Sequence, residues 1–200
     1  MTNSENIINA LQWRYATKQF DSDKTINQEH LHALLESVRL TPTSYGLQPF
    51  KAILVESSAR REELKDAAVD QSQVVDASHF LVLAAQTTIS HEHIDDYMEN
   101  MAKTREVDLE KVEGFGNYIK ATIAKFTDEQ FTTWNQKQCY IALGMILQTA
   151  AQLKIDATPM EGFSTIEFDR ILNLEEKGLT STVAIALGYR SDMDAQQHQA

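Results

Sequence analysis

The sequence contains few of the residues that build covalent frameworks. Among its 200 residues there is one cysteine, Cys139, which excludes an internal disulfide framework and any CxxC zinc or redox motif. This cysteine lies in the stretch QCYIALGMIL, which has the composition of a helix interior. We therefore expect Cys139 to be a buried, unreactive thiol.

Long hydrophobic runs are also absent. No stretch approaches the roughly 18 consecutive apolar residues that would span a bilayer. The first 20 residues, MTNSENIINALQWRYATKQF, lack the basic start and apolar run of a secretion signal. The sequence thus predicts a soluble, cytoplasmic protein that has no membrane partner.

Positive charge is scarce. The chain has 18 Lys and Arg against 29 Asp and Glu, which gives a formal net charge of -11 and a pI near 4.9. Non-specific nucleic-acid binding needs clustered Lys and Arg to displace counterions from phosphates. We therefore expect no nucleic-acid partner, and any anionic ligand must be met by a local basic pocket.

Familiar catalytic and metal signatures are missing. The sequence contains no GxSxG, GxxxxGK[ST], HExxH or GxGxxG motif. It therefore lacks the sequence signatures of α/β-hydrolases, P-loop nucleotide-binding proteins, zinc metalloproteases and dinucleotide-binding folds. His91 and His93 lie in SHEHIDD, but alternate residues point to different sides of a helix, and the acids suit a helix N-terminal turn. We expect no metal site, and no side chain stands out as catalytic.

The residues that are present favour one globular domain over 1–200. The chain is 42% hydrophobic and 24% charged, with no repeat and no low-complexity linker. Apolar residues at helical spacing predict helices over 5–16 and 27–40. Short apolar runs with β-branched residues predict strands over 50–56, 79–87 and 180–189. Because helices and strands alternate, the pattern favours a layered α/β or α+β fold.

Two longer segments stand apart. A charge-rich helical excursion around 95–130 has few large apolar residues to anchor it, so we expect it to be mobile. The segment 135–155 is apolar nearly all round. A helix of this kind is buried on most sides, either inside a domain or in a subunit interface, and the chain length favours an interface.

Three short segments could contact a ligand. Arg14 and Lys18 are four residues apart and could reach one anion, although capping of a helix C-terminus by cations explains them equally well. The uncharged loop TPTSYGLQPF suggests a segment that folds against protein or ligand while offering short hydrogen-bond donors. In ATPMEGF, proline followed by glycine lets backbone amides approach a flat ligand closely, although a plain turn has the same composition.

The order of these segments adds further information. RYATKQFD, TPTSYGLQPF, DQSQVVDASHFLVL, the long apolar helix, TPMEGF and EEKGLTSTVAIALGY follow one another along the chain. Together they resemble the FMN-dependent nitroreductase family, and are most similar to the oxygen-insensitive NAD(P)H nitroreductase and dihydropteridine reductase type. The resemblance runs from about Ile8 to Tyr189. It implies an α+β fold with a sheet flanked by helices, in a homodimer that has the long central helix and two FMN sites at its interface.

The resemblance also implies cofactor-binding residues near the N-terminus. Arg14 resembles the phosphate-binding arginine of the family, with Tyr15 and Ala16 alongside. Lys18 matches the lysine near the flavin pyrimidine edge, where a cation stabilises the anionic reduced flavin.

Further cofactor contacts come from three other segments. The loop that matches Thr41 to Pro49 crosses to the partner subunit in the family and hydrogen-bonds the flavin there. In that loop the resemblance selects Thr43, Ser44 and Gln48. The turn whose amides face the flavin ring corresponds to Glu161 and Gly162, and polar contacts to the pyrimidine ring correspond to Asp70, Gln71 and Gln73. Aromatic residues expected to gate the substrate pocket are Phe115, Tyr118, Phe126 and Phe131.

Two departures from the family pattern bear on the cofactor. The position of Asp70 is typically Asn, and a carboxylate there loses the donor half of an amide. Relatives continue with a Lys-x-Arg pair that binds the FMN phosphate, whereas this sequence stops at DAQQHQA. Arg190 or Lys51 could compensate in part. We therefore expect either a truncated chain or a loosely bound FMN.

The resemblance implies a ping-pong reaction in which NAD(P)H reduces FMN and a nitroaromatic or quinone-type acceptor then takes two electrons. The acceptor would be a small aromatic molecule, and the sequence does not choose between NADH and NADPH. A different reading is an FMN-free or weakly FMN-binding dimer that serves as an interaction or regulatory module. A yellow flavin that remains bound to the purified protein would favour the enzyme over the FMN-free dimer.

Overall fold

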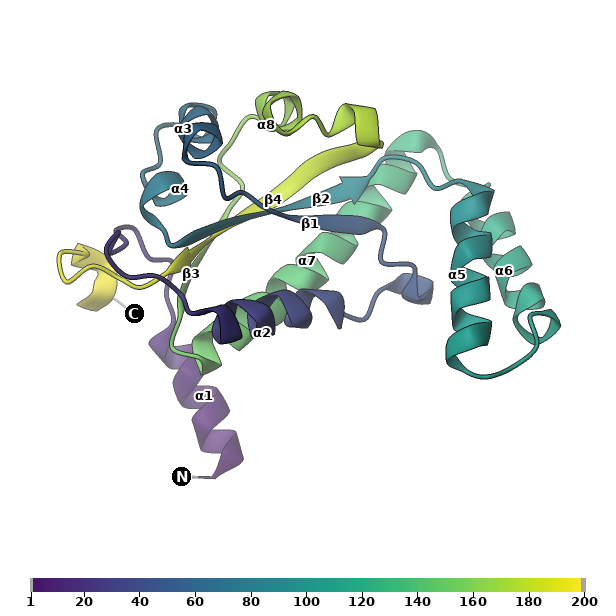
Figure 1. Ribbon diagram of the computed structural model, residues 1–200, viewed down its shortest axis with the longest axis horizontal. Helices are drawn as coiled ribbons and strands as arrows, with labels where there is room; N and C mark the ends of the chain where they lie inside the picture. The colour runs from purple at the N-terminus through teal and green to yellow at the C-terminus, as the bar shows by residue number, and fades with distance from the viewer. Residues whose placement is uncertain (1, 199–200) are drawn as a thin grey trace.

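The computed structural model describes residues 2–198 and contains one four-stranded antiparallel sheet with helices on both of its faces (Figure 1). The strand order is β1-β2-β4-β3. The strands are β1 (Phe50–Leu54), β2 (His79–Gln86), β3 (Asp156–Met160) and β4 (Leu179–Gly188). The helices are α1 (Asn3–Trp13), α2 (Gln28–Arg39), α3 (Ser58–Asp66), α4 (Gln73–Asp76), α5 (His91–Thr104), α6 (Glu110–Ile123), α7 (Asp128–Gln152) and α8 (Thr165–Leu172). This is the α+β architecture that the family resemblance implied.

The two central strands are covered on both faces. Within β2, Leu81 and Leu83 face the cluster that α2 and α7 complete, whereas Phe80 and Val82 face the cluster that α3, α4 and α8 complete. Successive side chains of a strand point to opposite faces, so a strand buried on both sides is apolar throughout. This explains why the run HFLVLAAQ shows no alternation of polar and apolar residues.

α5 and α6 lie beside the sheet rather than over it (Figure 1). Their facing side chains, including Ile94, Met98 and Ile119, form a third buried cluster that also takes in Leu47 from the loop before β1. α5 begins at His91, and the Ser90 side chain accepts a hydrogen bond from the His93 backbone at 3.1 Å. SHEHIDD is therefore a helix N-terminus, as the sequence predicted.

Several boundaries differ from those expected. The first helix ends at Trp13 rather than at residue 16, because the chain turns extended at Arg14, with φ -77° and ψ 141°. The long helix begins at Asp128 rather than at residue 135, since a capping box between Thr127 and Gln130 starts it there. Its last residue is Gln152.

One strand was not expected. The segment ATPMEGF, residues 157–163, was considered either as a flavin-facing segment or as a plain turn. Its first four residues belong instead to β3, and the turn begins only after Met160. Pro159 lies opposite Ile185 within this strand. Proline is tolerated there because β3 is at the edge of the sheet and has a partner on one side only. Over residues 2–198, no helix is long and apolar enough to cross a membrane.

Candidate functional site

The segment that follows α1 is held against β3. The Thr158 hydroxyl donates to the Thr17 carbonyl at 2.6 Å, and the Thr17 hydroxyl donates to Asp156 Oδ1 at 3.3 Å. Thr17 has no exposed surface. These contacts anchor the middle of the Trp13 to Gln19 segment, in which the sequence had placed four candidate residues.

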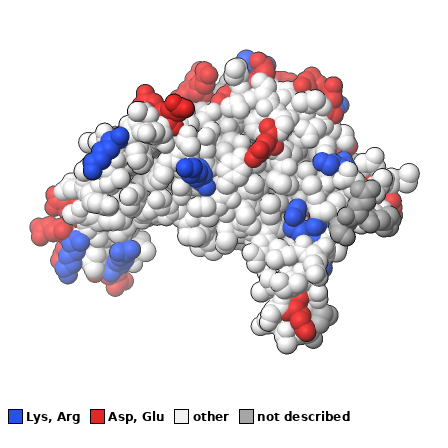
Figure 2. All heavy atoms as spheres, turned by 180° about the vertical axis from the view of Figure 1, so that it is seen from behind, with Lys and Arg blue, Asp and Glu red and all other residues white. Residues whose placement is uncertain are grey.

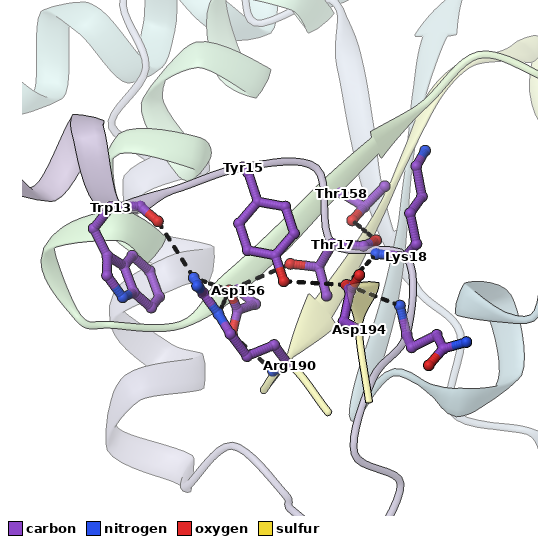
Figure 3. Close-up of polar contacts among 9 residues, drawn as sticks. Trp13, Tyr15, Thr17, Lys18, Asp156, Thr158, Arg190 and Asp194 are labelled. Atoms are coloured by element: carbon purple, nitrogen blue, oxygen red, sulfur yellow. Dashed lines mark hydrogen bonds and ion pairs between the residues drawn. The ribbon is translucent and has the colours of Figure 1, made fainter. Parts of the chain in front are cut away.

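Arg190 holds the beginning of the same segment (Figure 3). Its guanidinium lies 4.3 Å from the centre of the Trp13 ring and 4.5 Å from that of Tyr15. It forms an ion pair with Asp156 at 2.7 Å, and its Nη2 donates to the Trp13 carbonyl at 3.3 Å. The Arg190 guanidinium is thus paired with a carboxylate within the described chain. Lys51, the other cation considered from the sequence, lies on β1, at the opposite edge of the sheet from β3.

Asp194 holds the end of the segment. Its Oδ2 accepts hydrogen bonds from the backbone N–H groups of Lys18 at 2.8 Å and Gln19 at 3.2 Å, and from the Tyr15 hydroxyl at 3.1 Å. Burial alone would raise the pKa of Asp194, but the donated N–H groups of Gln196, Lys18 and Gln19 hold the pKa below its ordinary value. The Asp194 carboxylate is therefore charged at neutral pH and fixes the backbone of Lys18.

Two cations of this segment remain without partners. The Arg14 Nε atom is buried and has no hydrogen-bond partner among residues 2–198. Lys18 is exposed, and its ammonium makes no ion pair or hydrogen bond within the described chain. Figure 3 shows the Lys18 side chain extending away from the carboxylate that holds its backbone. A buried donor without an acceptor is costly, so the arrangement favours an anion at Arg14. Ala16, between them, is half-buried.

The turn after β3 meets the turn before α4. The Gln71 side-chain amide donates to the Gly162 carbonyl at 3.0 Å, which brings together two segments that the sequence had selected separately. Asp70 is exposed at a φ of 54°, a conformation that Asp and Asn tolerate. Gln73, by contrast, is buried in the first turn of α4. Asp70, Gln71 and Gly162 thus form the accessible part of this group.

Glu161 is linked to α7. The Tyr140 hydroxyl donates to Glu161 Oε1, and burial together with this hydrogen bond raises the pKa of Tyr140 to about 12. Tyr140 is consequently neutral at physiological pH and remains a hydrogen-bond donor. This contact places the exposed 161–162 turn beside the middle of α7.

The loop from Thr41 to Gln48 is ordered by its own contacts. The Thr43 hydroxyl accepts from the Gln48 backbone at 2.9 Å, and the Ser44 N–H donates to Gln138 Oε1 at the same distance. Tyr45 has a φ of 58°, and its carbonyl accepts from the Tyr97 hydroxyl at 2.9 Å. The loop is therefore tied to both α5 and α7.

The two groups of candidate residues lie on different sides of α7. Ser44 binds Gln138, whereas Glu161 binds Tyr140. Residues two apart on an α-helix point about 200° apart around its axis. Within one chain, the 41–48 loop and the 161–162 turn therefore contact different sides of α7. Figure 1 shows the segment after α1 far from the loop that precedes β1.

The expected gate aromatics fall into two kinds. Phe115 and Tyr118 are exposed on α6, and each ring centre lies 6.1 Å from that of Tyr45. Phe131 is buried against Trp134, at 6.1 Å between ring centres. Phe131 is thus a core residue and not a gate, because its ring is withdrawn from solvent.

Cys139 is fully buried on α7, and burial raises its pKa to about 12. The thiol is therefore protonated and inaccessible, as the sequence predicted. Within residues 2–198, no group of three or more His, Cys, Asp or Glu side chains is arranged to hold a metal ion.

The sequence did not identify Asp156 or Asp194, and it considered Arg190 only as a substitute phosphate-binding cation, although all three residues order the candidate segment. Lys18 and Asp194 are 176 residues apart, so no local spacing could connect them. A weak signal was present, since Asp156 begins β3 and Arg190 lies two residues after the end of β4. Residues at paired strand ends become neighbours once the register Asp156↔Gly188 is known.

Comparisons with known proteins identify the family of the chain. The model of the nitroreductase family matches residues 11–189. A candidate NAD(P)H nitroreductase of Staphylococcus aureus strain USA300 is 36% identical over 205 residues, which cover 94% of this chain and 87% of that protein.

Solved structures of low sequence identity show the same fold. A candidate NAD(P)H:FMN oxidoreductase from Staphylococcus epidermidis has a TM-score of 0.86 at 18% identity, covering 98% of this chain and 91% of that one. A candidate nitroreductase from Exiguobacterium sibiricum, solved in complex with FMN, has a TM-score of 0.79 at 16% identity, with 96% and 90% covered.

Proposed function

The chain belongs to the nitroreductase family, and we propose that it is an FMN-dependent NAD(P)H oxidoreductase that reduces nitroaromatic or quinone-type acceptors. The reaction would be ping-pong, with two electrons transferred in each half. The relatives described as NAD(P)H nitroreductase and NAD(P)H:FMN oxidoreductase support this assignment. A soluble nucleotide as reductant also fits the cytoplasmic location expected from the sequence.

The observation that carries the proposal is the unpartnered Arg14 guanidinium. Its buried Nε lacks an acceptor within the described residues 2–198, and a phosphate would supply one through a charge-assisted hydrogen bond. The Lys18 ammonium has no partner among residues 2–198 and extends from the same ordered segment. Arg14 would hold the FMN phosphate, and Lys18 would place a positive charge near the flavin ring. This donor set fits an anionic cofactor.

The turn residues would bind the flavin ring. Gln71 and Gly162 already contact each other, and the exposed N–H groups of the 161–162 turn would face the ring. Glu161 is oriented by Tyr140, which keeps its proton at neutral pH. Asp70 would accept but not donate hydrogen bonds at the position where relatives typically have Asn.

We propose that the remaining contacts come from a second copy of the chain. Thr43, Ser44 and Gln48 are separated from Arg14 by α7 within one protomer, so a homodimer would bring the two groups onto one flavin. Exposed apolar side chains on α1 and α7, among them Ile8, Leu11, Ile141 and Met145, support this arrangement. Seen from behind, the broad central surface carries few charged side chains (Figure 2).

When bound, FMN would accept a hydride from the nicotinamide and pass two electrons to the acceptor. The chain's own contribution is to bind and orient. Phe115 and Tyr118, exposed beside Tyr45, offer aromatic faces on which a flat acceptor could stack. Such stacking favours small aromatic acceptors over aliphatic ones.

The decisive experiment is the visible absorption spectrum of the purified protein, before and after incubation with excess FMN and desalting. We expect a flavin spectrum that survives desalting and bleaches when NADH or NADPH is added without oxygen. A panel of nitroaromatic and quinone acceptors then identifies which class restores the colour fastest. Protein that keeps no flavin would overturn the proposal and favour the FMN-free dimer considered from the sequence.

A further inference from the structure

A groove lies where α6 ends and α7 begins, apart from the candidate cofactor residues. Its volume is about 660 Å³, and the residues that line it include Lys125, Phe126, Glu129, Trp134 and Lys137. Pockets for small ligands commonly measure about 300 to 1,000 Å³. The groove is thus large enough for part of a nucleotide.

Aromatic rings form part of the groove. The Phe126 and Trp134 ring centres are 6.0 Å apart and their planes are inclined by 57°. Both side chains are half-buried, so each is held by the protein while part of its surface remains open. Held aromatic faces of this kind stack on flat heterocycles such as nucleobases.

The charge in the groove is opposite to that of the molecule. Lys125 and Lys137 are exposed and have no ion-pair partner within the described chain. Glu129 is the one acidic residue in the lining. On a chain whose net charge is -11, two unpaired lysines beside one acid form a local basic site. Such a site is suited to phosphate.

The groove adjoins the proposed cofactor loop. Trp134, in its wall, lies 6.1 Å from Tyr45 between ring centres. Gln138 continues the connection, because its Nε2 donates to the Trp134 carbonyl at 3.0 Å and its Oε1 accepts from Ser44. A ligand in the groove would therefore be next to the loop that we propose contacts the flavin.

We propose that this groove binds the adenosine-phosphate half of the nicotinamide dinucleotide that reduces the enzyme. The inference rests on the proposed function for the identity of the reductant. The adenine would stack on Trp134 or Phe126, and the phosphates would bind Lys125 and Lys137. The aromatic rings and the two lysines together suit a ligand that is both flat and anionic.

The first test is calorimetric titration of adenosine 2′,5′-bisphosphate and of ADP into the purified protein. Lys125→Glu and Lys137→Glu each replace an attraction with a repulsion, so we expect each to weaken binding roughly tenfold. The matched control is Lys111→Glu, which makes the same change in net charge on an exposed α6 residue outside the groove lining. It should bind both nucleotides as the parent protein does.

The second test uses turnover. Lys125→Glu and Lys137→Glu should raise KM for the reduced dinucleotide while leaving kcat unchanged. Neither should change KM for reduced nicotinamide mononucleotide, which lacks the adenosine half. Adenosine 2′,5′-bisphosphate should compete with the dinucleotide.

The inference is overturned if neither nucleotide binds, if the groove variants and Lys111→Glu bind equally, or if inhibition is not competitive with the dinucleotide. A protein that holds no flavin would instead contradict the proposed function. The calorimetric test needs no flavin, so the two failures can be told apart. Thermal unfolding of each variant verifies that it is folded.

Discussion

At the scale of single residues, Arg14 and Asp194 have complementary roles. Asp194 is charged, 1% exposed and hydrogen-bonded to several donors, whereas the buried Nε of Arg14 has no acceptor among residues 2–198. The Asp194 carboxylate orders the segment after α1, whereas the Arg14 guanidinium remains available to bind a ligand. Each role predicts a different response to substitution.

Arg14→Met should weaken FMN binding by one to two orders of magnitude, because a hydrogen bond to a charged group contributes about 1.5 to 3 kcal/mol. The free energy of unfolding without FMN should hardly change, since the Arg14 Nε makes no hydrogen bond within residues 2–198 and Met keeps most of the apolar part of the side chain. Fluorescence titration with FMN and urea unfolding measure the two quantities. Arg39→Met, which removes an exposed arginine paired with Glu36, is the control and should bind FMN normally. Equal affinities in the two variants would rule out the phosphate role of Arg14.

Asp194→Ala should lower the free energy of unfolding at pH 7 by about 2 kcal/mol, because the part-buried N–H groups of Lys18 and Gln19 lose their charged acceptor. The folded-state pKa of Asp194 lies below its ordinary value, so its contribution is present above the unfolded pKa of about 3.9. The contribution is lost as pH falls through the folded pKa. Urea unfolding between pH 3 and 7 should therefore show the parent and the variant converging in acid. A difference that does not depend on pH would mean that the carboxylate charge is not what stabilises the segment.

At the scale of elements, the junction between the 41–48 loop and α5 is tightly packed. Gly46 has a φ of 77°, and a Cβ added there would lie 2.2 Å from the Tyr97 hydroxyl oxygen. That hydroxyl donates to the Tyr45 carbonyl. Glycine is required at this position for both its backbone conformation and its small size.

Gly46→Ala should lower the free energy of unfolding by about 2 kcal/mol, from left-handed strain together with displacement of Tyr97. Gly114→Ala is a matched control, because it lies within α6 and an added Cβ meets nothing within 4 Å. That control should instead stabilise the protein by about 0.5 to 1 kcal/mol. Thermal and urea unfolding show whether each variant raises or lowers the free energy of unfolding. An unchanged free energy in Gly46→Ala would show that the loop adjusts freely.

The helical excursion shows what an element's sequence can and cannot indicate. Helical spacing predicted helices near 95–130, and α5 and α6 occur there. The packing of Met98 against Gly116 was not predictable, because a Cβ at Gly116 would lie 2.8 Å from Met98 Cγ. Such complementarity depends on how two helices approach each other, which neither helix encodes alone.

At the scale of the whole molecule, the candidate cofactor residues lie on different sides of α7. We therefore predict that FMN binding depends on a second subunit. Ile141→Asp with Met145→Asp places two charges on the exposed apolar face of α7. We expect a monomer in analytical ultracentrifugation and loss of FMN binding, because burying unpaired charges in an interface is unfavourable. Ile166→Asp, at an exposed apolar position on α8, should remain dimeric. A monomeric double variant that keeps FMN would contradict a shared site.

The sequence by itself determined the elements whose signal is local. The apolar runs of β2 and β4, the stripes of α2 and α7, and the helix start at Ser90 follow from residue periodicity and capping, which act over a few positions. Order and composition of the short motifs also identified the family and the Arg14 and Lys18 candidates.

Only the tertiary structure decided how those candidates are held and separated. β3 exists because its edge pairs with β4, and the ordering of residues 13–19 depends on Asp156, Arg190 and Asp194 from distant parts of the chain. The opposite placement of Ser44 and Glu161 depends on where two turns meet one helix. Each of these results from contacts between residues far apart in sequence, for which no local spacing carries a signal.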